Sequence, residues 1–342
     1  MNAPHRQRGV ALITAVVLVA LATVLATAIA FSTAMAARRA AGSTAVEQGF
    51  QLALGAEALA AYALREDFKG QTVTTGGGAN PASGPGLAPG PAQAQDTPIE
   101  EWAKFFGPVE VSPGVSLEAK LDDEQGKFNL NSLLKSDGTI DEDSRAIFVA
   151  LLKLLQLEEK WAYLVADWID TDGNLNAGGA EDAVYAGQQP GYRTANHYIT
   201  SISELMQLPD FGRDRFMKLR AHVTALPPQV RNINVCFATP AVLDALVTAA
   251  GTANTEYTVV DPKAFAQDRA VGCHPRRDVI TRSMAGDRKQ FIERRVTEQT
   301  EYFALRSWVT IGTTRFALYS LLRRDPLQQG QVFTVQRSFG TE

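Results

Sequence analysis

Oxygen-bearing side chains recur at alternate positions in one short stretch of the chain. With Asp170 counted as position 1, Asp172 stands at position 3, Asn174 at position 5 and Glu181 at position 12. Calcium loops use this spacing, because a hard cation takes six to eight oxygen ligands and the final glutamate can bind through both of its oxygens. Asp182 adds a further carboxylate. The spacing therefore predicts a calcium site.

The stretch departs from the EF-hand pattern at one position. Leu175 occupies position 6, where an EF-hand has glycine, and Gly173 comes two residues early. We therefore expect a loop that follows a different path from an EF-hand. The alternative interpretation is a solvated acidic loop whose Asp and Asn side chains serve turns and helix caps.

An enzyme alternative uses the same aspartates. Asp170 and Asp172 follow an apolar stretch, as in the nucleophile loop of haloacid-dehalogenase-type phosphatases, and would make the chain a membrane-tethered, metal-dependent phosphohydrolase. That loop follows a parallel strand, whereas residues 161–169 have helical spacing. The sequence also has no G-x-S-x-G, no H-E-x-x-H and no phosphate loop in a strand–helix context. We therefore expect no enzymatic activity.

Composition limits the remaining classes of function. The 342 residues suffice for about two domains. A net charge of −4 argues against nucleic-acid binding, and two Cys with four His exclude a zinc ribbon or an iron–sulfur cluster. Residues 201–212 are similar to a helix-hairpin-helix, a fold that can bind DNA phosphates. That motif has glycine where this chain has Asp210, so we expect these residues to serve helix packing.

The two cysteines leave two possibilities open. Cys236 and Cys273 could pair in an oxidising periplasm, or each could remain a buried thiol.

A membrane helix is predicted at the N-terminus. Residues 10–31 form an almost unbroken apolar run of 22 residues, which spans about 33 Å as a helix and matches the hydrocarbon core of a bilayer. Arg6, Arg8 and Gly9 precede the run directly, as in a prepilin-type leader that is cut before the apolar helix. A plain anchor, a cleaved secretory signal and a buried core helix are the competing interpretations.

The rest of the pattern predicts an α+β fold. Helical periodicity continues from the membrane run to about residue 64, and Gly and Pro dominate residues 76–91. Alternating apolar residues predict a strand at 115–121 and three antiparallel strands near the C-terminus. The simplest account is a long helix packed on an antiparallel sheet, with an all-α domain inserted between two strands. The predicted segments are a leader at 1–9, the transmembrane and amphipathic helix at 10–70, a disordered linker at 71–97, the first part of the sheet at 98–121, the inserted domain with the calcium loop at 122–290, and the C-terminal strands at 291–342.

Several motifs in one order resemble a known family, the minor pseudopilin K of type II secretion systems. The resemblance covers nearly the whole chain apart from the predicted linker. Its motifs are Arg8-Gly9-Val10-Ala11-Leu12-Ile13-Thr14, Ala53-Leu54-Gly55-Ala56-Glu57, Gln125-Gly126-Lys127-Phe128-Asn129-Leu130-Asn131, Asp167-Trp168-Ile169-Asp170-Thr171-Asp172, Gly179-Ala180-Glu181-Asp182, Tyr192-Arg193-Thr194-Ala195-Asn196 and Ser203-Glu204-Leu205.

The resemblance implies a pseudopilin fold, cleavage by the prepilin peptidase between Gly9 and Val10, and N-methylation of Val10. It also implies that Thr14 stands where most pilins carry a glutamate, which suits a subunit at a special end position. Calcium in the insertion is implied as well. The ligands that the resemblance transfers to this chain are Asp170, Asp172, Glu181 and Asp182, with Asn174 and Asn196.

The implied function is structural. The resemblance places the chain in the bacterial inner membrane as a single-pass protein with its globular part in the periplasm. There it would cap the pseudopilus tip with minor pseudopilins I and J, contact other pseudopilins and the inner-membrane platform, and support export of folded proteins. No nucleic-acid partner is implied, and a DNA-binding competence-type pseudopilin stays as a second alternative.

Overall fold

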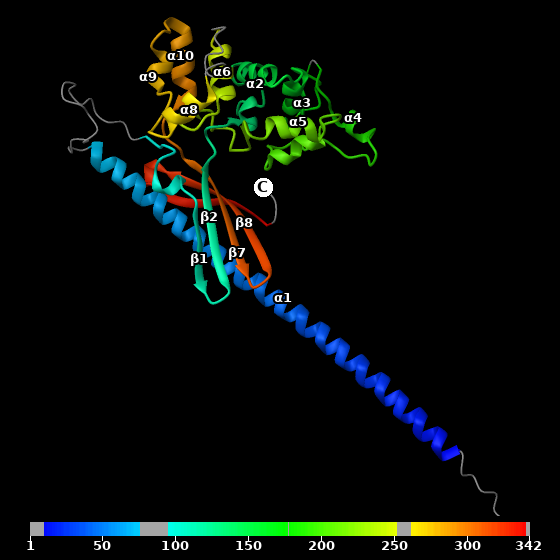
Figure 1. The fold of residues 1–342 in the computed structure, drawn as a ribbon. Coiled ribbons are helices and arrows are strands. Elements are labelled where there is room, and N and C mark those ends of the chain that lie inside the picture. Colours follow the sequence, from blue (N-terminus) through cyan, green and yellow to red (C-terminus); the bar gives the residue numbers. More distant parts are fainter. Residues whose placement is uncertain (1–9, 76–94, 177, 252–260, 340–342) are drawn as a thin grey trace, which may run out of the picture.

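One long helix dominates the computed structural model, which describes residues 10–75, 95–176, 178–251 and 261–339. Helix α1 (Val10–Thr75) has 66 residues, a length of roughly 100 Å. Figure 1 shows its N-terminal part projecting away from the rest of the chain, and residues 11–44 are exposed. It is the one helix in the described part of the chain that is long and apolar enough to cross a membrane.

An antiparallel sheet lies along the C-terminal half of α1 (Figure 1). Its strand order is β1-β2-β7-β8-β9. The central pairing joins β2 to β7 without interruption, from Val115 opposite Ile311 to Asp123 opposite Phe303. The strand bounds are β1 (Phe106–Ser112), β2 (Val115–Asp123), β7 (Tyr302–Ile311), β8 (Thr314–Asp325) and β9 (Gln331–Phe339).

Alternation along the strands gives the sheet one apolar face, which packs on α1. Near the middle of α1, Ala53 and Ala56 pack against Leu117, Val309 and Leu318. A second cluster at the end of α1 buries Leu64 among side chains of β2, β7 and β8, together with Trp102. These two clusters hold the helix on the sheet.

The chain between β2 and β7 forms a separate helical lobe with its own hydrophobic core. Figure 1 shows the lobe beyond the end of the sheet, away from the projecting part of α1. Its helices are α2 (Glu142–Leu154), α3 (Lys160–Ile169), α4 (Asp182–Ala186), α5 (Gly212–Leu219), α6 (Pro240–Ala249), α8 (Pro262–Arg269), α9 (Arg277–Thr281) and α10 (Gly286–Arg295). Short 3-10 helices are η1 (Glu101–Ala103), η2 (Leu130–Leu133), η3 (Ile202–Gln207) and η4 (Pro326–Gln328), of which η2 and η3 lie in the lobe.

The α+β class and the insertion are confirmed, but the expectation of an all-α insertion was wrong. Two parallel pairs of two-residue strands lie in the lobe, β3 (Phe128–Asn129) with β4 (Val223–Thr224) and β5 (Ile233–Asn234) with β6 (Val296–Thr297). Two residues are too few to show an alternating pattern, so the sequence carried no signal for them.

The predicted linker at 71–97 was wrong at both of its ends. Helix α1 continues to Thr75, because each added residue gains a backbone hydrogen bond without a new nucleation cost. At the other end Asp96 is fully buried, and its backbone N–H donates to Glu298 O. The part of the linker at 76–94 lies outside the described residues.

The sheet has one strand more than the sequence predicted. Strand β1 (Phe106–Ser112) occupies an edge, and its register with β2 shifts between Phe106 and Val109. That irregularity, beside Gly107 and Pro108, breaks the alternation that reveals a strand. The three C-terminal strands do form, although the predicted boundary at residue 290 falls within α10 and the sheet resumes only at Tyr302.

Candidate metal centre

The candidate centre lies between the end of α3 and the start of α4. Helix α3 buries Trp161, Leu164, Val165 and Trp168 in the core of the lobe, which fixes the position of its last turn. Asp170 is the residue that ends α3, and Glu181 is the residue that precedes α4. The loop between the two helices therefore brings the Glu181 carboxylate close to that of Asp170.

Three carboxylates converge at this point. One oxygen atom each from Asp167, Asp170 and Glu181 lies within 4.8 Å of the others. All three residues are buried, with exposed fractions of 0%, 5% and 9%. Asp167 joins the cluster because residues three apart on a helix share a face.

Part of this buried polar surface has no partner. Among the described residues, Asp170 Oδ1 and Glu181 Oε1 are buried and accept no hydrogen bond, and the buried Tyr185 hydroxyl beside them also has none. Asp167 does have a hydrogen-bond partner, because Asn176 N donates to its Oδ2 over 3.3 Å. Burial of an oxygen atom without a hydrogen-bond partner destabilises the folded protein, so these carboxylates lower the stability of the lobe unless a ligand binds them.

The pKa values of the three carboxyl groups are all raised, as expected for buried acids that lie close together. Burial, reinforced by the nearby charges of Asp167, Asp172 and Glu181, raises the pKa of Asp170 to about 7. Burial and neighbouring carboxylates also raise the pKa of Glu181, and burial raises that of Asp167 despite its hydrogen bonds to Asn176. Either protons or a cation must balance the three carboxylates, and oxygen donors of this kind suit a hard divalent cation.

The other predicted ligands lie elsewhere. Asp172 and Asn174 are exposed, and Asp172 Oδ1 accepts a hydrogen bond from Asn174 N over 2.7 Å. Asp182 Oδ1 accepts from Thr194 N and Thr194 Oγ1 over 3.1 and 2.7 Å, and these bonds lower its pKa. Asn196 is exposed. The structure thus brings Asp170 and Glu181 together and leaves these four outside the carboxylate cluster.

Asp167 was missing from the ligand set predicted by spacing. The signal was present, because the helical pattern over 161–169 places Asp167 on the same face as Asp170. The structure adds a reason for Gly179, because a Cβ there would lie 1.9 Å from Asp167 Oδ2. Only glycine lets the loop close over the Asp167 carboxylate.

The remaining predicted sites are away from this centre. Cys236, just before α6, forms a disulfide with Cys273, which lies between α8 and α9. Gly9 lies outside the described residues, and Val10 is the first residue of α1. The predicted cleavage site therefore sits directly at the start of the described helix.

The family model for type II secretion system protein K matches residues 126–228, the first part of the helical lobe. Type II secretion system protein K of Pseudomonas aeruginosa is 30% identical over 344 residues, covering 98% of this chain and 93% of its own. The protein of the same name from Pectobacterium carotovorum subsp. carotovorum is also 30% identical, covering 98% and 97%.

A solved structure shares the fold. One chain of the GspK-GspI-GspJ complex from the type 2 secretion system of enterotoxigenic Escherichia coli has a TM-score of 0.69 and 20% identity. The match covers 89% of this chain and all of that one. With relatives this similar over nearly their whole length, the chain belongs to the type II secretion system protein K family.

Proposed function

We propose that this chain is a minor pseudopilin that caps the tip of the type II secretion pseudopilus, together with minor pseudopilins I and J. One observation carries the proposal: the helical lobe lies at the end of the molecule opposite the projecting half of α1 (Figure 1). In a fibre built from α1-type helices, a lobe of this size obstructs the position that a next subunit would occupy. The solved complex supports the choice of partners, because it contains a K subunit together with I and J.

The tip position has a direct test. An epitope tag in an exposed loop of the lobe, followed by labelled electron microscopy of sheared fibres, should place label at one end only. Label along the fibre length would contradict the tip assignment. Co-purification from detergent should give a stable complex with I and J, and its failure would contradict the partner assignment independently.

We also propose a single-pass inner-membrane protein with its body in the periplasm. The apolar segment of α1 is exposed over its whole length, so it needs lipid or other helices around it. The Cys236–Cys273 disulfide supports an oxidising compartment for the lobe.

Processing at the N-terminus follows the same proposal. The prepilin peptidase would cut between Gly9 and Val10, and the new N-terminus would be methylated. Intact-mass measurement of membrane-extracted protein should show a species that begins at Val10 and carries one added methyl group. A species that begins at Met1 would contradict the proposal.

Calcium is the cation proposed for the candidate metal centre. Asp167, Asp170 and Glu181 would hold it, and the ion would balance their charges and bind the unpartnered Asp170 and Glu181 oxygens. It would stiffen the loop between α3 and α4, with an affinity of about 10⁻⁴–10⁻³ M, as in extracellular modules. Asp172, Asn174, Asp182 and Asn196 would contribute to the fold of the surrounding loops.

Calcium-dependent melting of the full chain in detergent tests this ligand set. A calcium concentration ten times the dissociation constant should stabilise the protein by about 1.4 kcal/mol. Asp167→Asn should abolish the stabilisation, whereas Asp182→Asn, which keeps an oxygen for Thr194, should retain it. Equal loss in both variants would contradict the proposed centre.

The proposed role is structural rather than enzymatic. Asp170 follows α3, a helix, and not the parallel strand that a phosphohydrolase nucleophile loop requires. Asp170→Asn should therefore reduce secretion and calcium-dependent stability together. Loss of a phosphatase activity of the purified chain in that variant would favour the enzyme instead.

A further inference from the structure

The base of the helical lobe is tied to α1 and the sheet through one buried arginine. Arg324 of β8, with a side chain 3% exposed, donates from Nη2 to the Asp96 carboxylate over 2.6 Å. Its Nη1 donates to Asp67 Oδ2 of α1 over 3.0 Å. The same guanidinium donates to Thr300 O over 2.8 Å, at the point where the chain returns from the lobe to β7. Arg324 therefore connects α1, residues 95–103 and the return from the lobe.

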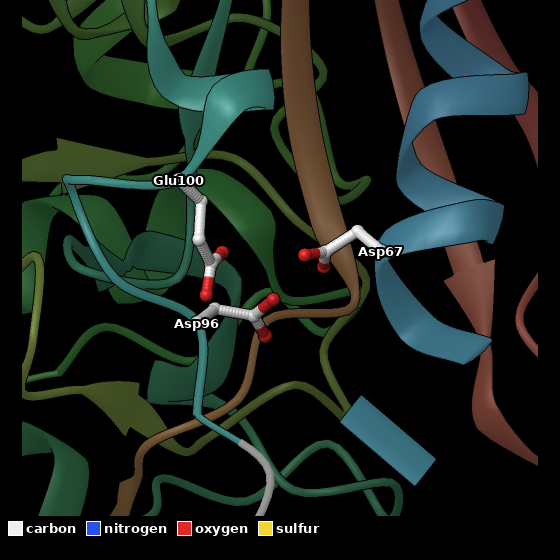
Figure 2. A group of neighbouring side chains, drawn as sticks. All are labelled: Asp67, Asp96 and Glu100. Atoms are coloured by element: carbon white, nitrogen blue, oxygen red, sulfur yellow. The ribbon is translucent and has the colours of Figure 1, made fainter. Parts of the chain in front are cut away.

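A third carboxylate faces the same place. Figure 2 shows the side chains of Asp67, Asp96 and Glu100 pointing toward one another, from α1 and from the segment that precedes η1. One oxygen from each lies within 4.8 Å of the others. Glu100 Oε2 accepts a hydrogen bond from Trp102 Nε1 over 2.5 Å. Three carboxylates thus lie together in a largely buried joint, where one guanidinium contacts two of them, Asp67 and Asp96.

The other ionisable groups around the joint already have partners or add negative charge. Within the part of the chain that the structure describes, none of the basic groups forms an ion pair with Glu100. The neighbouring acids are Asp123, which accepts from the Thr300 hydroxyl, Glu124, which pairs with Lys127, and Glu298, which accepts from Gln95 and from the Arg277 backbone N–H. The neighbouring base is Arg269 of α8, whose charge acts on Asp123.

We propose that Glu100 carries a proton at neutral pH, and that this proton holds residues 95–103 closed against α1 and the base of the lobe. Carboxylates that share one site cannot all ionise, because each charge opposes the next. Arg324 contacts Asp67 and Asp96 directly and does not contact Glu100, so Glu100 is the carboxylate that takes the proton. Burial and the charge of Asp96 also raise the pKa of Asp67, to about 6, although Arg324 opposes that shift. Burial, with the charges of Asp67 and Asp96, raises the pKa of Glu100 to about 8.

The closed segment matters because it contacts all three parts of the molecule. The Trp102 ring packs edge-on against Phe303 of β7, with centroids 5.0 Å apart. It also lies 5.5 Å from the Phe237 ring of the lobe. Loss of the Glu100 proton places a further negative charge beside Asp67 and Asp96. Their repulsion outweighs the hydrogen bond from Trp102, which favours the ionised form, so the contact that seats the lobe on the sheet weakens.

The sign of the pH dependence follows from linkage. A carboxyl whose pKa is higher in the closed form than its ordinary value of 4.5 binds a proton on closing. The closed form is therefore favoured at acidic pH, and the advantage is lost as pH rises from about 5 to about 8. Each pH unit in that window shifts the opening equilibrium by up to about tenfold.

Hydrogen exchange of the full chain in detergent, with chelator present, measures this equilibrium. The protection factors of amides 95–103, corrected for the intrinsic exchange rate, should fall about tenfold to a hundredfold between about pH 6 and about pH 8. Glu100→Gln keeps a neutral side chain of the same size and should make the fall clearly smaller than in the wild type. The raised pKa values of Asp67, about 6, and Asp123, about 7, account for the remaining pH dependence. Glu101→Gln is the matched control, because Glu101 is exposed and pairs with the exposed Lys104, and its profile should follow the wild type.

Three outcomes would overturn the proposal. The first is a Glu100→Gln profile as steep as that of the wild type, and the second is a wild-type profile that is already flat. The third is a wild-type profile that added calcium flattens, since that would assign the joint to a cation instead of a proton. None of these readouts involves secretion or the α3–α4 loop, so failure here is distinguishable from failure of the tip and calcium proposals.

Discussion

The carboxylate of Glu57 in α1 forms a two-pronged ion pair with the guanidinium of Arg337 in β9. Arg337 Nε and Nη2 donate to the two Glu57 oxygens over 2.9 and 2.7 Å. The Ser320 and Thr334 hydroxyls donate to the same carboxylate, each over 2.7 Å. Glu57 is 7% exposed, so α1 carries a fully bonded acid into an otherwise apolar contact with the sheet. The arrangement fixes the position of the last two strands along the helix.

Disruption of this pair should destabilise the protein in a non-additive way. We expect Glu57→Ala and Arg337→Ala each to lower the free energy of unfolding, with a coupling energy of about 1–3 kcal/mol in a double-mutant cycle. Chemical denaturation of the full chain in detergent measures it. A coupling near zero would mean that the two hydroxyls alone hold Glu57.

Two glycines of α1 should respond oppositely to alanine. At Gly49 a Cβ would lie 2.9 Å from the Phe316 Cβ, so Gly49→Ala should cost about 1–3 kcal/mol by pushing the helix off the sheet. At Gly55 no atom lies within 4 Å of the added methyl group among the described residues, so Gly55→Ala should gain about 0.5–1 kcal/mol from helix propensity. Thermal unfolding of the two variants compares them directly, and a change of the same sign in both would contradict the close approach at Gly49.

Gly179→Ala should remove calcium-dependent stabilisation without removing a carboxylate. The new methyl group would collide with Asp167 and force that side chain away from Asp170 and Glu181. The expected result is loss of the melting shift that calcium produces in the wild type. Gly187→Ala is the matched control, because its nearest contact would be an ordinary 3.5 Å. A calcium response that survives in Gly179→Ala would show that Asp167 is not a ligand.

Removal of the disulfide should destabilise the lobe selectively. Cys236 and Cys273 are 37 residues apart in sequence, so their bond limits a sizeable loop of the unfolded chain. In the chain-entropy account, the double variant Cys236→Ser and Cys273→Ser should lose about 3–4 kcal/mol. Hydrogen exchange should locate the loss in α6 and α8 while the sheet keeps its protection. An equal loss of protection in the sheet would contradict a lobe with its own core.

The sequence predicted the elements in which one hydrophobic pattern repeats over many residues. The apolar run of α1 and the alternating strands near the C-terminus each repeat one pattern over many residues, and the structure has them where they were expected. Strand β1 was not predicted, because Gly107, Pro108 and a shift of register interrupt its alternating pattern. The end of α1 at Thr75 was not predicted either, because a segment rich in Gly and Pro indicates low helix propensity but does not define the residue at which the helix ends.

The candidate centre was predictable only in part. Spacing identified Asp170 and Glu181, because both lie at ends of helices that the core of the lobe positions. It also selected Asp172 and Asn174, whose side chains the path of the loop turns to the surface. Asp167 belongs to α3 and not to the loop, so a search limited to loop spacing could not include it. The burial of each carboxylate depends on tertiary packing that no spacing rule contains.

The uninterrupted pairing of β2 with β7 has a consequence for the architecture. The strand that leads into the lobe and the strand that leaves it are immediate neighbours, so the lobe occupies the place of a simple hairpin turn. Excision of the lobe and closure with a short turn would leave every rung between these two strands intact. The lobe is therefore an insertion that leaves the strand order of the sheet unchanged.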